Sequence, residues 1–209
     1  MRGLDFPVNL LYFNQMNKDL IEKVQKWVEE IYSNANHLVR TGYWVKRLYP
    51  EAKDSLIIAS ITHDIERAFK DGRNPPSPEM NGAKWDDPVY NRWHSERSAV
   101  FVKNFLKKEG ANSKLIDDVA KLISVHEEGG WKEADLLRDS DSISFLEINA
   151  PYFISKIGKD LSSHRQNLSR GEVREKFDYM FNRIGSKKAK QFATPFYEKA
   201  IEELNKVKD

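Results

Sequence analysis

Cysteine is absent from this 209-residue sequence, so disulfide bridges and metal sites built on thiolates are excluded. Any metal would be bound by His, Asp or Glu, which suits Mn, Mg, Co, Ni, Fe or Zn without distinguishing between them. No apolar run approaches the roughly 18 residues that span a bilayer. Residues 1–16 also lack the apolar core and cleavage site of a signal peptide, so we expect a cytoplasmic protein that does not contact a membrane.

Neither sign of charge dominates, because 34 basic residues are matched by 32 acidic ones and the formal net charge is only +2. This balance gives no reason to expect binding to a nucleic acid polymer. The chain is long enough to bury a core, and its length suits one domain. We expect residues 1–150 to form that core with an N-terminal segment, and residues 151–209 to form helices packed on it in the same domain.

Glycine and proline are also scarce, at 10 and 8 residues, and they cluster between segments whose apolar residues recur with a helical period. The spacing and the breakers predict helices over 18–33, 37–48, 51–69, 94–109, 113–126 and 131–149. Asn112 or Ser113 is expected to cap the fifth helix, and a capping box at Ser169–Glu172 predicts a later one. Thr194 and Pro195 are expected to begin the last helix. The sequence therefore predicts an all-α fold, in which a helical bundle carries a C-terminal helical extension.

Residues 70–92 form the clearest irregular stretch of the sequence, with four prolines and two glycines. At about 20 residues this stretch is longer than most connections, and such loops are often lids or binding loops. Two interpretations stay open. The loop could close over a ligand with its aromatic and basic side chains, Lys84 among them, or it could be an ordinary surface excursion whose aromatic residues pack on the core.

Four histidines lie on apolar faces of the expected helices, where their side chains should point inward. They are His37, His63, His94 and His126, and Asp64 directly follows His63. Burying these polar groups costs roughly several kcal/mol unless they are paired. Neutral imidazoles and ionised carboxylates are the ligands that divalent first-row ions prefer. The set therefore favours a shared metal ion, although any one of these histidines alone would be read as a hydrogen-bonded core residue.

Five segments of the chain resemble the HD-domain superfamily of metal-dependent phosphohydrolases over about residues 30–150. They read NHLVRTGYWVKRL, ASITHDIERAF, WHSERSAVFVKNFLKKEG, LISVHEEGG and RDSDSISFLE. The resemblance implies an all-α core in which a first His, an adjacent His-Asp pair and a final Asp hold one divalent ion. These positions correspond to His37, His63, Asp64 and Asp141, with Asp139 as the second candidate for the final Asp.

In members of this superfamily with two ions, two intervening histidines hold the second ion and the Asp of the pair bridges both ions. His94 and His126 occupy these places in order. The resemblance therefore implies one or two divalent ions. In the alternative with one ion, His94 and His126 would contact a phosphate group.

The resemblance also implies hydrolysis of a phosphoester or phosphoanhydride in a nucleotide or another small phosphorylated molecule. The ion would lower the pKa of a bound water and offset charge on phosphoryl oxygens. The candidate catalytic residues are Asp64, Glu66 and Arg67. The candidate phosphate-binding residues are Arg40, Arg67, Arg97 and Lys84. A surface charge or a structural ion pair remains the alternative for each arginine, and a helix-surface position for Glu66.

Two known substrates of the superfamily are disfavoured by the sequence. Arg67 and Ala68 stand where the ppGpp hydrolases carry a Glu-Asp pair, and the chain lacks the Gly-Tyr-Pro element of the cyclic di-GMP enzymes. Two other functions stay open, because di-iron oxygenases such as myo-inositol oxygenase share the same order of ligands and a non-catalytic module could sense a nucleotide. The oligomeric state is not determined, and a homodimer is compatible with the sequence.

Overall fold

The computed structural model of this protein describes residues 8–69, 86–158 and 168–207. The secondary structure of these residues is helical. No strand occurs in these ranges, so the all-α prediction is confirmed. In chain order the elements are α1 (Val8–Ile31), α2 (Ala35–Leu48), α3 (Asp54–Ser60), the 3₁₀ turn η1 (Ile65–Ala68), α4 (Pro88–Lys108), α5 (Ser113–Ile123), α6 (Lys132–Ser144), the π-helical turn η3 (Phe145–Asn149), α7 (Ala150–Ile154), α8 (Arg170–Asn182) and α9 (Lys187–Lys206).

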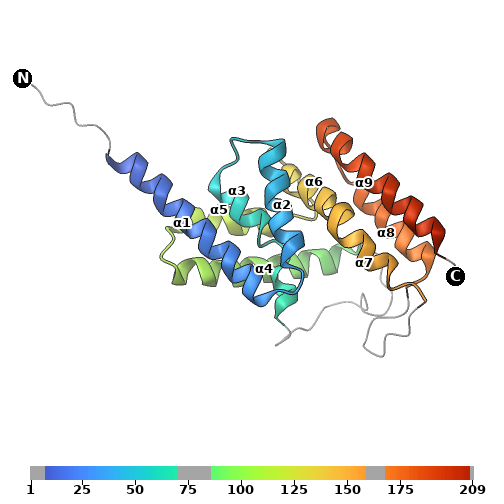
Figure 1. The fold of residues 1–209 in the computed structure, drawn as a ribbon. Coiled ribbons are helices and arrows are strands. Elements are labelled where there is room, and N and C mark those ends of the chain that lie inside the picture. The colour runs from blue at the N-terminus through green and yellow to red at the C-terminus, as the bar shows by residue number, and fades with distance from the viewer. Residues whose placement is uncertain (1–7, 70–85, 159–167, 208–209) are drawn as a thin grey trace, which may run out of the picture.

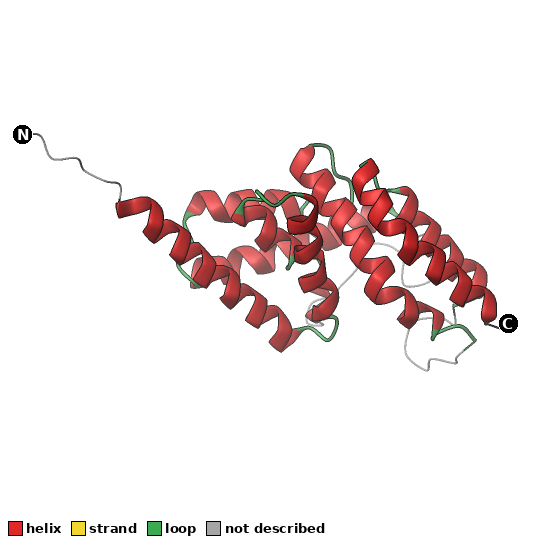
Figure 2. Ribbon diagram, turned by 45° about the horizontal axis from the view of Figure 1, so that its top comes forward, coloured by secondary structure: helices red, strands yellow, loops and turns green. Residues whose placement is uncertain are grey.

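The helices α2 and α6 pack against each other in the middle of the molecule and separate two apolar cores. The first core lies among α1, α3, α4 and α5, and α2 contributes Leu38 to it. The second core lies among η3, α7, α8 and α9, and α2 contributes Trp44 to it. Figures 1 and 2 show α1 and the pair of α8 and α9 at opposite ends of the molecule. The C-terminal helices therefore pack on the same central pair that supports the N-terminal core.

The predicted helix over 51–69 is wrong in its second half. The helix α3 ends at Ser60, residues 61–64 form turns, and η1 follows. The hydroxyl groups of Ser60 and Thr62 donate to the carbonyl oxygens of Ile57 and Ile58, at 2.7 and 2.6 Å. Such local side-chain bonds compete with the backbone hydrogen bonds of a helix. His63 and Asp64 therefore lie on a tight turn rather than on one helical face.

The predicted beginning of the last helix is also wrong. The helix α9 begins at Lys187 with Ser186 as its N-cap, and Pro195 lies in its interior. An internal proline costs about 3 kcal/mol because it removes one backbone hydrogen bond and crowds the preceding turn. The fully buried Ala189 and Ala193 lie one turn apart on the inner face of α9, together with Leu204 near its end. Packing of this face outweighs the local preference of proline for a helix start.

Other helix ends lie several residues from the predicted ones. The helix α1 begins at Val8 rather than at residue 18, and α5 ends at Ile123 rather than near residue 126. The helix α4 begins at Pro88 because the carboxylate of Asp87 accepts hydrogen bonds from two backbone N–H groups of its first turn. Part of the loop predicted over 70–92 is therefore helical. Residues 70–85, including Lys84, lie outside the described residues, so the role of this loop stays a prediction.

Two predicted helix caps are confirmed. The side chain of Asn112 accepts a hydrogen bond from the backbone N–H of Leu115 at the start of α5. Ser169 and Glu172 form the expected capping box at the start of α8. Both caps depend on residues three positions apart, which explains why the sequence alone could identify them.

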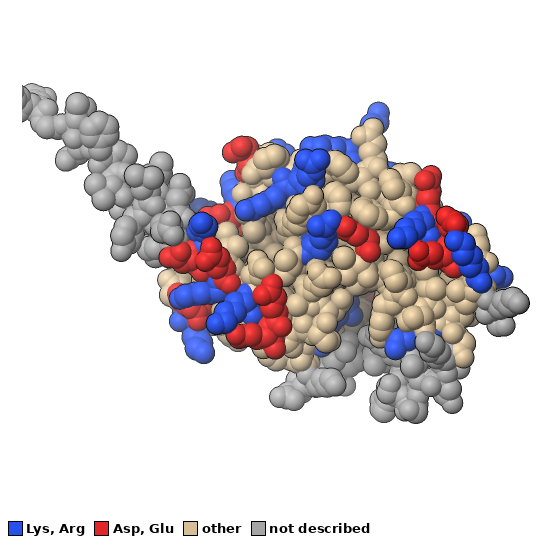
Figure 3. Space-filling model, viewed as in Figure 1, with Lys and Arg blue, Asp and Glu red and all other residues tan. Residues whose placement is uncertain are grey.

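The described surface carries charges of both signs. Figure 3 shows Lys and Arg interspersed with Asp and Glu on one face of the molecule, as the balanced composition suggests. Among the described helices, none combines the length and the apolar character needed to cross a membrane.

The placement of residues 151–209 in the same domain can be tested with Phe177, which is fully buried in the second core. Phe177→Ala should lower the free energy of unfolding by about 3–5 kcal/mol, because it leaves a cavity between α8 and η3. Urea unfolding followed by circular dichroism and by tryptophan fluorescence should show one shared transition. Val100→Ala, at a 56% exposed position, should change the stability by no more than about 0.5 kcal/mol. Two separate transitions would contradict a single domain.

Candidate metal centre

The predicted ligands meet in a buried polar region beside the central helices α2 and α6. His37 comes from α2, His94 from α4 and Asp141 from α6, whereas His63 and Asp64 come from the turn after α3. The remaining predicted ligand, His126, lies on the turn after α5. The four predicted histidine ligands are each at most 2% exposed. Five different segments therefore bring these side chains together, with Asp141 5% exposed and the side chain of Asp64 16% exposed.

Two compact groups of possible ligand atoms share one carboxylate. His37, His63 and Asp64 form the first group, and Asp64, His94 and His126 form the second. Within each group the ligand atoms lie within 4.8 Å of one another. The structure therefore brings together five of the six predicted ligands, and it places Asp64 where it could bridge two cations.

The sixth predicted ligand, Asp141, lies against the first group without belonging to it. Its Oδ1 atom is 3.1 Å from Nε2 of His37 and 3.3 Å from Nε2 of His63. The alternative, Asp139, points elsewhere, because its two carboxylate oxygens accept hydrogen bonds from the backbone N–H groups of Gly185 and Ser186 at 2.8 and 2.9 Å. Asp139 therefore supports the start of α9, and Asp141 is the aspartate that faces the histidines.

Backbone and hydroxyl groups orient three of the imidazole rings. Nδ1 of His63 lies 2.9 Å from the carbonyl oxygen of Ser60, and Nδ1 of His126 lies 2.8 Å from that of Ile123. A carbonyl can only accept, so Nδ1 donates in both rings and Nε2 faces the cluster. His37 is held similarly, because the Ser144 hydroxyl donates to the carbonyl of His37 and accepts from its Nδ1 at 2.9 Å. This arrangement directs Nε2 of all three rings inward.

Four atoms at the middle of the cluster are buried without a hydrogen-bond partner among the described residues. They are Nε2 of His63, Oδ1 of Asp64, Nδ1 of His94 and Nε2 of His126. An unsatisfied buried polar atom costs about 1–3 kcal/mol. Because the four atoms converge and are the usual ligands of divalent ions, a cation would remove this cost. The donor set therefore fits a divalent metal ion.

Arg67 holds the outer oxygen of Asp64. Its Nε donates to Oδ2 of Asp64 at 2.8 Å, and its Nη1 donates to the hydroxyl of Tyr90 at 3.2 Å. Burial alone would raise the pKa of Asp64, but Arg67 and the neighbouring imidazoles lower this pKa below its usual range. Asp64 therefore stays ionised, with Oδ1 directed at both groups of histidines. Arg67 thus forms an ion pair with the shared ligand, which is the structural role left open by the sequence, whereas its predicted roles in catalysis and phosphate binding stay predictions.

Two residues of the centre were not identified from the sequence. Glu127 follows His126, and its Oε1 atom lies 3.2 Å from Nε2 of His94. Arg183, at the end of α8, donates to the outer carboxylate oxygens of both Glu127 and Asp141. Burial opposes ionisation of these two carboxyls, but Arg183 holds the pKa of each well below its usual range. The His-Glu pair at 126–127 is a signal that sequence reasoning could have used, whereas no local signal marks Arg183.

The other predicted residues that the structure describes, Arg40, Glu66 and Arg97, form ion pairs within the protein. Both carboxylate oxygens of Glu147 accept from Arg40, at 2.7 and 2.5 Å. Arg97 lies 3.8 Å from a carboxylate oxygen of Glu66. Glu66 is fully buried, so its interpretation as a helix-surface residue is wrong. A structural ion pair, the alternative left open by the sequence, thus describes the contacts of Arg40 and Arg97.

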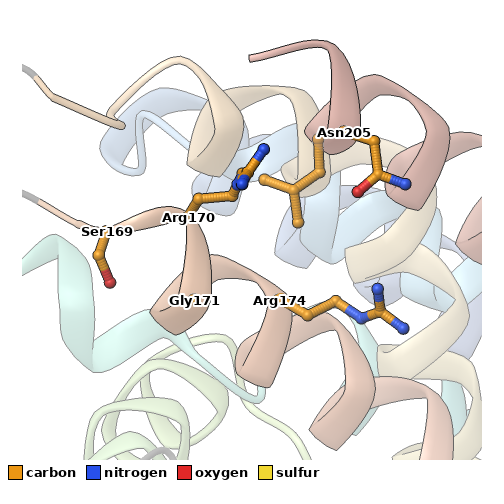
Figure 4. Close-up of a pocket in the computed structure, with 6 residues that line it drawn as sticks. Ser169, Arg170, Gly171, Arg174 and Asn205 are labelled. Atoms are coloured by element: carbon orange, nitrogen blue, oxygen red, sulfur yellow. The ribbon is translucent and has the colours of Figure 1, made fainter. Parts of the chain in front are cut away.

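A surface pocket lies apart from the predicted ligands, between the start of α8 and the end of α9 (Figure 4). It is lined by Ser169, Arg170, Gly171, Arg174, Leu204 and Asn205. None of the predicted site residues lines this pocket. The pocket and the histidine cluster are therefore different places in the fold.

Searches of protein-family models, of curated proteins and of solved structures found no match to this chain. The class of the protein therefore follows from its own fold and site. It is an all-α protein with a buried cluster of His and Asp side chains that could hold a metal ion.

Metal binding should release a proton from His63. Burial lowers the pKa of this imidazole, but Asp141 and Asp64 raise it, and the resulting pKa is about 9. Burial lowers the pKa of His126 to about 4, so this ring is already neutral at pH 7. Because metal ligands must be deprotonated, binding of Mn²⁺ at pH 7 should release about one proton from His63. The apparent affinity should rise about tenfold for each pH unit above 7 and level off once the pH exceeds the pKa of His63.

Isothermal titration calorimetry in buffers with different ionisation enthalpies measures this proton release. Asp139→Asn should release the same proton, since Asp139 does not face His63. A binding enthalpy that is independent of the buffer, together with an affinity that is constant from pH 7 to 9, would show that His63 is neutral before the metal binds.

Proposed function

We propose that this protein is a metal-dependent phosphohydrolase of the HD type, acting on a nucleotide or another small phosphorylated molecule. The observation that carries the proposal is the position of Asp64, whose carboxylate belongs to both compact groups of ligand atoms. His37 and His63 would hold one cation with Asp64 and Asp141. The histidines on α4 and after α5 would hold a second one. The resemblance of the five sequence segments to HD phosphohydrolases supports the choice of reaction.

The carboxylates of the cluster support binding of a cation. Three carboxylates, those of Asp64, Glu127 and Asp141, and two guanidinium groups, those of Arg67 and Arg183, leave one net negative charge once His63 has released its proton. A bound divalent ion supplies a water of lowered pKa and positive charge for phosphoryl oxygens.

The residues of this chain orient the reacting groups in the proposed reaction. Arg67 holds the outer oxygen of Asp64, so that its inner oxygen stays directed at the histidines. The carbonyl of Ser60 and the hydroxyl of Ser144 fix the rings of His63 and His37. Ligands fixed in this way need little rearrangement when a substrate binds, which favours catalysis by positioning.

A screen of phosphorylated metabolites against Mn²⁺, Co²⁺, Mg²⁺, Ni²⁺ and Zn²⁺ tests the proposal, with release of phosphate and pyrophosphate as the signal. Metal-stimulated release from one group of substrates is the expected result. The shared Asp64 also suits a di-iron oxygenase, and two bound irons with consumption of O₂ would favour that function instead. Tight binding of a nucleotide that stays intact with every metal would indicate a sensor.

Asp141 and Asp139 form a matched pair of buried carboxylates two residues apart on α6. Asp141→Asn should lower activity at least about 100-fold and reduce bound Mn²⁺, because Asp141 faces His37 and His63. Asp139→Asn should keep the metal but lose about 1–3 kcal/mol of stability, since one N–H group at the start of α9 loses its acceptor. Mass spectrometry of bound metal and thermal unfolding measure the two effects. The reverse pattern would show that Asp139 is the ligand.

A further inference from the structure

Arg183 links two carboxylates that lie on different sides of the histidine cluster. Its Nη1 donates to Oε2 of Glu127 and its Nη2 donates to Oδ2 of Asp141. Its Nε donates to the hydroxyl of Ser142 at 2.8 Å. The side chain is only 9% exposed, so this guanidinium is committed to the interior of the protein. Each carboxylate keeps its other oxygen for the imidazoles.

Asp141, which accepts from Arg183, lies directly beside the first group of ligands. Its outer oxygen is bound by Arg183, and its inner oxygen lies 3.1 Å from Nε2 of His37 and 3.3 Å from Nε2 of His63. Nδ1 of each of these rings is bound to Ser144 or Ser60, so Nε2 is the atom available to a metal. At the first group, Arg183 therefore contacts a ligand directly.

Glu127 contacts a histidine of the second group and does not itself belong to that group. Its Oε1 atom lies 3.2 Å from Nε2 of His94, and an ionised carboxylate can only accept, so this nitrogen donates. In a neutral ring the proton on Nε2 leaves a lone pair on Nδ1. Nδ1 of His94 lies 3.4 Å from Oδ1 of Asp64, and both atoms are buried without a hydrogen-bond partner among the described residues. Glu127 therefore selects the tautomer of His94 that could bind a metal next to Asp64.

We propose that Glu127 and Arg183 are positioning residues of a centre for two cations. Glu127 orients His94 toward the second cation, and Arg183 holds both Glu127 and the first-site ligand Asp141. This inference rests on the metal binding of the proposed function, and it is independent of which phosphorylated substrate is hydrolysed. It assigns to the C-terminal helices a part of the metal centre.

Removal of the Glu127 carboxylate should affect one cation only. In calorimetric titration with Mn²⁺, the wild-type protein should bind two ions, and Glu127→Ala should weaken the second about 10–100-fold while the first is unchanged. Glu127→Gln should restore part of the affinity, because its amide oxygen can still accept from His94. Glu128→Gln is the matched control, since Glu128 is the next residue and pairs with Arg92 at the surface.

The tautomer of His94 gives a readout that does not depend on the metal. Nitrogen-15 NMR of the metal-free wild-type protein should show the proton of His94 on Nε2. In Glu127→Ala this preference should be lost, and in Glu128→Gln it should be kept. A proton on Nδ1 of His94 in the wild type, or two Mn²⁺ ions bound equally well by Glu127→Ala, would overturn the assignment of Glu127.

Arg183→Met should differ from the Glu127 variants by weakening both cations, because both supported carboxylates lose their partner. Arg174→Met is the control on the same helix, where Arg174 pairs with Asp178 at 3.0 Å on the surface. Circular dichroism shows whether each variant is folded, and Arg183→Lys, which keeps the charge, should restore part of the affinity. A folded Arg183→Met with unchanged binding would overturn the role of Arg183.

One bound ion in the wild type would overturn the inference while leaving a hydrolase with a single ion intact.

Discussion

The carboxylate of Asp64, whose side chain is 16% exposed and whose Oδ1 atom is buried, is the constraint on which the rest of this structure depends. A charge taken out of water needs partners, and Asp64 has Arg67 on one oxygen and two groups of imidazoles around the other. Those partners come from α2, α4, η1 and the turns after α3 and α5, so they form a site only when the helices have packed. The same packing leaves four converging atoms unsatisfied, which is the feature that makes a metal ion the natural complement.

The position of this polar region follows from how the two apolar cores are arranged. Both cores use α2 and α6, which contribute Leu38 and Leu137 to the first and Trp44 and Ile143 to the second. Of the cluster, His37 and Asp141 lie on this shared pair of helices, and the other polar side chains reach them from α4 and from the turns after α3 and α5. The second core positions α8, and α8 delivers Arg183 to Asp141 and Glu127. The C-terminal helices thus form the second core and also place a guanidinium group against two carboxylates of the histidine cluster.

The histidines show how much of the site could be predicted from the sequence. Helical spacing correctly predicted that all four rings are buried, and the resemblance to HD phosphohydrolases named the set that the structure brings together. The local reason was nevertheless wrong for His126, which lies on the turn after α5, and for His63 and Asp64, which lie on a turn because nearby hydroxyl groups end α3 early. Hydrogen bonds from side-chain hydroxyls involve only a few atoms and do not change the spacing of the apolar residues. The spacing therefore could not predict where α3 ends.

The sequence by itself determined the all-α class and the caps at Asn112 and Ser169, because these depend on residues within one or two turns of each other. Only the tertiary structure decided between Asp139 and Asp141. Two residues that are two positions apart on a helix point about 200° apart, so one faces the histidines and the other faces the start of α9. The choice depends on which helices pack on each side of α6. For the same reason Arg183, 42 residues after Asp141, became part of the centre only through the packing of α8.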